Sequence, residues 1–98
     1  FEKSQCSYNF NESNPDNLRK LFEIYQDEAN TLIVKKLTYP ALDFVLKCSH
    51  TFNLLDARGV ISVTDRAQYI EKIRKLAREV ASSWVNERES LNFPLINR

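Results

Sequence analysis

Apolar residues recur every three or four positions after Pro15, and this spacing predicts a first helix. Asn14 can cap it, and Pro15 and Asp16 suit its first turn. The apolar set spans about 120° of a helical wheel, which is typical of a helix with one buried face. Its members are Leu18, Leu21, Phe22, Tyr25, Ala29, Leu32 and Ile33. Lys35 and Lys36 are expected in the last turn, where cations complement the helix dipole.

A second helix is predicted from Ala41 to Leu55, and its apolar arc is wider. Tyr39–Pro40 separates it from the first helix, because proline is tolerated at the first helical position. The apolar residues cover about 200° of the wheel, which is more than one neighbouring helix can bury. They are Ala41, Leu42, Phe44, Val45, Leu46, Cys48, Phe52 and Leu55. We therefore expect this to be the central helix.

A connector and a third, longer helix follow. Gly59 lies in the connector and can adopt the left-handed backbone conformation found beyond helix ends. Ser62–Asp65 has the spacing of a capping box, in which side chains at both ends satisfy free amides. The third helix is expected from about Val63 to about Ser90, and Asn92–Pro94 ends the pattern. Its apolar stripe is Tyr69, Ile70, Ile73, Leu76, Ala77, Val80, Ala81, Trp84 and Leu91.

The predicted fold class is all-α, a three-helix bundle with a long third helix and an extended N-terminal segment. Residues 1–13 show no period and are expected to form a strap or linker, whereas residues 14–98 form one helical domain. The chain begins at Phe1 with neither a methionine nor an apolar leader, so we expect a fragment of a longer polypeptide. Without a secretory signal, Cys6 and Cys48 are expected to be reduced thiols.

Composition removes several classes of function. Fourteen basic and thirteen acidic residues give a net charge of +1, which provides no strong attraction to nucleic acid or a membrane surface. The single glycine excludes a glycine-rich phosphate loop and a dinucleotide-binding turn. No apolar run approaches the about 18 residues that span a bilayer, so no membrane partner is expected.

The chain offers few residues for catalysis or metal binding. His50 is the single imidazole, and Cys48 projects about 160° away from it on a helix, whereas metal sites need three or four convergent ligands. The same geometry argues against a nucleophile–imidazole pair with Cys48 or Ser49. We expect no catalytic, cofactor-binding or metal-binding residue here, and we expect His50 to lie at the edge of the polar face beside Asp43 and Lys47.

Ser49 and Asn53 are polar residues in the middle of the apolar arc of the central helix. An unpaired polar group buried there costs about 1–3 kcal/mol. In a structural interpretation, Ser49 bonds to its own helix and Asn53 bridges to the connector or to the third helix. In a functional interpretation, both contact a partner subunit docked on that face. The sequence favours the structural one.

Arg66 is expected in the first turn of the third helix, on the same side as Trp84. A buried guanidinium needs an acceptor, which Asp56 or Asp43 could supply. The sequence thus predicts a clamp that holds the connector against the bundle, with a phosphate contact as the alternative.

Four basic residues of the third helix raise the question of nucleic-acid binding. Glu71 and Glu79 lie among them, and Glu71 is well spaced to pair with Lys75. A patch that follows a phosphate backbone would be denser and unopposed by acids, so a solvated face is favoured. The four are Lys72, Arg74, Lys75 and Arg78.

The run from Pro40 to Arg66 closely resembles the C-terminal part of the α subunit of bacterial-type glycyl-tRNA synthetase. The resemblance covers nearly the whole chain and is weakest over residues 1–17. The segments that carry it are Pro40-Ala41, Ser49-His50, Phe52-Asn53-Leu54-Leu55-Asp56-Ala57-Arg58-Gly59 and Ile61-Ser62-Val63-Thr64, followed by an acidic residue and Arg66.

This resemblance implies a helical domain appended to a class II aminoacyl-tRNA synthetase, whose parent enzyme uses ATP and Mg²⁺ to attach glycine to its tRNA. In that family the active site lies on an antiparallel sheet in the preceding domain, so its ATP- and glycine-binding residues have no counterpart here. The implied partners are a β subunit or fused β part, the catalytic domain of the α part and, indirectly, tRNA. The implied location is the cytoplasm, or the matrix or stroma of an organelle.

We therefore expect a non-catalytic role in subunit assembly or in support of tRNA binding. The docking surface is hypothesised to be the exposed side of the central helix with the connector, including Lys47 and Arg58. An independent helical protein-interaction module is the alternative, and a basic bundle that binds tRNA directly is a third possibility. The structural and interface candidates are Ser49, Asn53, Asp56, Arg58 and Arg66.

Overall fold

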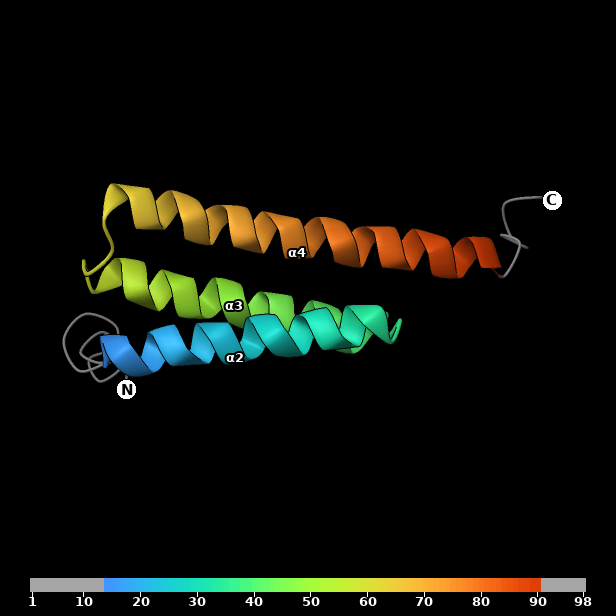
Figure 1. Cartoon of the computed structure of the whole chain (residues 1–98), viewed down its shortest axis with the longest axis horizontal. Coiled ribbons are helices and arrows are strands. Elements are labelled where there is room, and N and C mark those ends of the chain that lie inside the picture. Colours follow the sequence, from blue (N-terminus) through green and yellow to red (C-terminus); the bar gives the residue numbers. More distant parts are fainter. Residues whose placement is uncertain (1–13, 91–98) are drawn as a thin grey trace, which may run out of the picture.

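Three antiparallel helices make up the described part of the chain. A computed structural model describes residues 14–90, with side chains described through residue 85. Helix α2 spans Pro15–Val34, α3 spans Thr38–Ala57 and α4 spans Val63–Ser90. Helices α2 and α3 form a hairpin, and α4 runs along α3 and extends past the turn that joins α2 to α3 (Figure 1). The all-α prediction is confirmed for residues 14–90. No described helix combines the length and the apolar character that crossing a bilayer requires.

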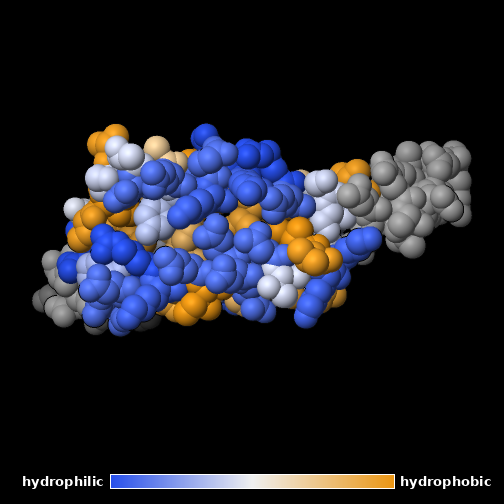
Figure 2. All heavy atoms as spheres, in the orientation of Figure 1, coloured by the Kyte–Doolittle hydropathy of each residue, from blue (hydrophilic) through white to orange (hydrophobic). Residues whose placement is uncertain are grey.

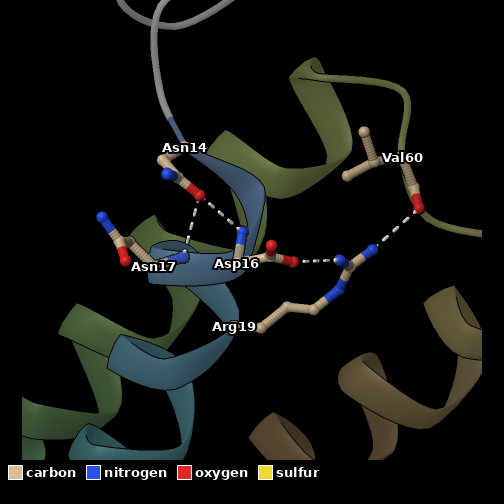
Figure 3. Close-up of polar contacts among 5 residues, drawn as sticks. All are labelled: Asn14, Asp16, Asn17, Arg19 and Val60. Carbon is tan, nitrogen blue, oxygen red and sulfur yellow. Dashed lines mark hydrogen bonds and ion pairs between the residues drawn. The ribbon is translucent and has the colours of Figure 1, made fainter.

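Helix α2 is capped at both ends by hydrogen bonds. The Oδ1 atom of Asn14 accepts from the backbone N–H groups of Asp16 (2.9 Å) and Asn17 (3.2 Å) (Figure 3), as the sequence predicts. At the other end, the Leu37 N–H donates to the Leu32 carbonyl at 2.9 Å. The Lys36 N–H donates to the Ile33 carbonyl at 3.0 Å. These bonds form a Schellman motif, which satisfies carbonyls that the helix leaves free.

The lysine pair lies just past the end of α2, so the prediction that it occupies the last turn is wrong. Lys35 is the C-cap residue, and Lys36 adopts a left-handed conformation with φ of 61°. The Schellman motif requires that conformation at this position, and it overrides the modest gain from placing cations inside the helix. Lysine stands where glycine is the usual residue.

The start of α4 matches the sequence prediction, whereas α3 begins earlier than predicted. Helix α3 begins at Thr38, so Pro40 is its third residue and not its first. Proline is accommodated there because the first four N–H groups of a helix have no partner within it. Helix α4 begins at Val63 as predicted, and the Ser62 hydroxyl accepts from the Asp65 N–H at 3.1 Å. Gly59 is left-handed as expected, with φ of 68°.

The core is built on the face of α3 that both other helices cover. Phe22 of α2 is fully buried and meets Tyr69 of α4 edge to face, with ring centroids 4.7 Å apart. Phe52 of α3 packs on the same tyrosine at 5.8 Å. Tyr69 therefore links the three helices, and one cluster of buried residues joins them. Its members are Phe22, Ala29, Ala41, Val45, Cys48, Phe52, Leu76 and Val80.

Substitutions at the two left-handed residues are expected to change the free energy of unfolding in opposite directions. Lys36→Gly is expected to raise the free energy of unfolding by about 0.5–1 kcal/mol, because a Cβ atom is disfavoured in this conformation. Gly59→Ala is expected to lower it by about 1 kcal/mol, and no atom lies within 4 Å of the added Cβ, so the effect reports backbone strain alone. Urea denaturation measures both. Lys35→Gly is the control, because Lys35 has an ordinary φ of −80° and should gain nothing.

Cys48 is a free thiol whose side chain is buried in this core, and Cys6 lies outside the described residues. Burial disfavours the thiolate and raises the pKa of Cys48 from its ordinary 9.0 to about 11. We predict that iodoacetamide at pH 8 modifies Cys48 at least about 100-fold more slowly in the folded chain than in urea, by peptide mass spectrometry. Equal rates would contradict the burial.

The same shift predicts a loss of stability in alkali. The unfolded thiol loses its proton near pH 9, whereas the folded one keeps it until about pH 11. The contribution of the protonated thiol is therefore complete below pH 9 and declines as the pH rises towards 11. Cys48→Ala should flatten this part of the stability profile.

Candidate functional site

Within residues 14–85, the cysteine and histidine side chains that could carry chemistry do not converge. Cys48 points into the core, whereas His50 is exposed at a groove between α2 and α3 that Asp43 and Lys47 also line. The Nζ atom of Lys47 lies 2.9 Å from the Oδ2 atom of Asp43 and 4.3 Å from the centre of the Phe44 ring. The prediction that His50 lies beside these two charged residues is confirmed. Among the described residues, no group of three His, Cys, Asp or Glu side chains is arranged to hold a metal ion.

The two polar candidates of α3 lie away from the core. Asn53 is exposed and Ser49 is half-buried, so the burial that the apolar arc implied for Asn53 is wrong. Helices α2 and α4 cover the side of α3 that carries Cys48, whereas Ser49 and Asn53 share a second stripe with Leu42 and Leu46. Leu42 is 42% exposed and Leu46 is 59% exposed. Two of the eight apolar residues of the predicted arc are therefore exposed, whereas five are buried.

Arg66 forms the predicted clamp, but it does so at the surface. Its Nη2 atom lies 3.4 Å from the Oδ2 atom of Asp56, and the two side chains are 55% and 41% exposed. Asp56 is one of the two predicted acceptors, whereas the predicted burial of the guanidinium is wrong, because the first turn of α4 is exposed to solvent. Arg58, the remaining candidate, is half-buried in the connector.

A second arginine holds the connector from α2, and sequence reasoning missed it. The Nη2 atom of Arg19 donates to the Val60 carbonyl at 3.1 Å, and its Nη1 atom lies 3.4 Å from the Oδ1 atom of Asp16 (Figure 3). The Arg19–Val60 contact spans 41 positions in the chain, and no spacing rule predicts such a pair. Arg19 and Arg66 thus hold the connector and the adjoining helix end from two sides.

The basic residues of α4 form a solvated face, as the sequence favoured. Lys72, Arg74, Lys75 and Arg78 are all exposed. Arg78 forms an ion pair with Glu71 at 3.0 Å. Hydrophilic residues cover most of α4 in Figure 2, and apolar residues reach the surface between α4 and the other two helices. The predicted partner of Glu71 was Lys75, so that pairing is wrong, and the basic run lies between two acidic residues, Glu71 and Glu79.

The apolar surface between α3 and α4 forms a groove of about 350 Å³. Leu42 is one wall, Trp84 closes one end and is 40% exposed, and the exposed lining is apolar. Such grooves are where amphipathic helices and other apolar partners bind. The lining residues are Thr38, Tyr39, Leu42, Ala77, Val80, Ala81 and Trp84.

Comparison with known families shows that residues 1–89 match the glycyl-tRNA synthetase alpha subunit family. The chain belongs to this family. Family membership confirms the resemblance that residues 40–66 indicated. It identifies the chain as part of an aminoacyl-tRNA synthetase, a glycine–tRNA ligase. In this part of an alpha subunit, an apolar groove lies beside the start of α3. At the opposite end of α3, Arg19 bonds to the connector and Arg66 pairs with Asp56 in the last turn of the helix.

The ion pair of Arg66 and Asp56 is predicted to fix geometry and to add little stability. A double-mutant cycle with Arg66→Ala and Asp56→Ala, measured by urea denaturation, should give a coupling free energy below about 1 kcal/mol, because both side chains are half in solvent. The coupling should fall further in 1 M salt. A coupling above about 2 kcal/mol would contradict the exposed geometry.

Proposed function

We propose that this chain is a non-catalytic helical part of a glycyl-tRNA synthetase alpha subunit that serves subunit assembly and thereby supports tRNA binding. The parent enzyme attaches glycine to its tRNA with ATP and Mg²⁺, and its catalytic residues lie in another part of the alpha subunit. The observation that carries the proposal is an apolar groove, open among the described residues, on a chain that belongs to this family. The beta subunit or fused beta part is the proposed partner, in the cytoplasm or in an organelle.

Two features support a non-catalytic role. The thiol of Cys48 is buried with its pKa raised to about 11, which makes it a poor nucleophile at neutral pH. The imidazole of His50 is exposed on another face of α3. Half-buried Ser49 and exposed Asn53 lie along the stripe that carries Leu42 and Leu46, which suits a protein interface with a polar rim.

Assembly is favoured over direct tRNA contact by the charge pattern of α4. Its four exposed cations between positions 72 and 78 are flanked by Glu71 and Glu79, and Arg78 is already paired with Glu71. A surface that follows a phosphate backbone gains affinity from cations free of such competition. The exposed apolar residues beside them gain most by contact with protein.

The proposal predicts that loss of this region impairs transfer of glycine to tRNA but not activation of glycine with ATP. Deleting residues 14–90 from the full alpha subunit should lower glycylation of tRNA at least about 10-fold in the presence of the beta subunit. Glycine-dependent ATP–pyrophosphate exchange should be retained, because amino-acid activation uses residues outside this region. The alpha–beta dissociation constant should rise in parallel with the loss of glycylation.

Three results would contradict this function. Loss of pyrophosphate exchange together with glycylation would place catalytic residues, or essential support for them, in this region. Unchanged glycylation would contradict the proposed role in subunit assembly. A full protein that activates no glycine would favour an independent protein-interaction module. Circular dichroism of the deletion variant establishes that the remaining subunit is folded.

A further inference from the structure

The groove between α3 and α4 has the length and spacing to receive a helix. On α4, Ala77, Ala81 and Trp84 follow each other at intervals of four and three residues and share one face. At a rise of about 1.5 Å per residue they span about two helical turns. On α3, Leu42 lies in the opposite wall, whereas Leu46 lines the other groove, between α2 and α3.

Small side chains in the α4 wall leave the groove open. Ala77 and Ala81 do not reach across to α3, while Thr38 and Ser83 hold the two helices together, with their hydroxyl oxygens 3.4 Å apart. Large apolar side chains of a partner can therefore enter between the helices. Burial of such surface gives roughly 25 cal/mol per Å², so two or three inserted side chains supply a useful share of a binding free energy.

The edge of the groove is basic on the α4 side. Arg74 lies one helical turn before Ala77 and Arg78 one turn before Ala81, and both arginines are exposed. Arg78 is paired with Glu71 at 3.0 Å, whereas Arg74 forms no ion pair with a described residue and is the cation available at this edge. A ligand that lies in the groove with carboxylates along its α4 edge would complement this charge.

We propose that the occupant is an amphipathic helix of the beta subunit or beta part, with large apolar residues at helical spacing in the groove and an acidic residue opposite Arg74. This inference rests on the proposed role in assembly and adds the surface and the chemistry of the partner. The apolar lining distinguishes the groove from a phosphate site, where polar and cationic groups line the floor.

The test measures the dissociation constant of the full alpha subunit and the beta subunit. Ala81→Glu fills the groove and places a negative charge near the acidic edge of the partner, and it should weaken binding at least about 10-fold. Arg74→Glu should weaken binding about 5- to 10-fold and reduce its salt dependence. Ile24→Glu is the matched control, because Ile24 is 58% exposed on α2 and lies outside the groove. It should leave affinity within about twofold.

The outcomes separate this inference from the function on which it rests. If Ala81→Glu leaves affinity unchanged while deletion of residues 14–90 abolishes association, the groove is not the docking site although the assembly role stands. If the deletion also leaves association unchanged, both the groove inference and the proposed assembly function are contradicted. If Ala81→Glu weakens tRNA binding and not subunit association, the groove contacts RNA and the inference is overturned. Unchanged thermal melting of each variant excludes unfolding as the cause.

Discussion

The fold depends on the burial of one face of α3 by two helices at once. Ala41, Val45, Cys48 and Phe52 follow each other along that face and are all buried. Neither α2 nor α4 alone can remove it from water, and Tyr69 of α4 contacts both Phe22 and Phe52. Loss of a buried phenylalanine side chain costs about 3–5 kcal/mol. That is a large share of the about 5–15 kcal/mol that holds a whole domain together.

The polar contacts position the helices and add less free energy. Asn14 and Ser62 define where α2 and α4 begin, and Arg19 and Arg66 hold the connector and the adjoining end of α3 from two sides. Each contact is exposed and contributes about 1 kcal/mol or less. The direction of α4 relative to the hairpin, and thus the shape of the α3–α4 groove, follows from these weak contacts acting together with the core.

The sequence predicts most of this fold because the helices are strongly periodic. The apolar spacing and the local capping signals placed the start of α4 at Val63 and left-handed Gly59 beyond the end of α3. Left-handed Lys36 could not be predicted, because its residue type disfavours a conformation that the turn imposes. The helical wheel showed that the apolar arc of α3 was too wide for one neighbouring helix. It could not show which side of α3 would remain exposed to solvent. Asn53 was misplaced for that reason, and Arg19 was missed because its contact to Val60 is non-local.

Hydrogen exchange of the full alpha subunit, alone and bound to the beta subunit, tests most directly the claim that the groove between α3 and α4 binds a partner. The amides of Phe22 and Cys48 should be among the slowest in both states, because they lie in the core. Binding should slow the amides of residues 77–85 at least about 10-fold and leave those of residues 23–31 unchanged. Slowing confined to α2, or none within residues 14–85, would contradict the account.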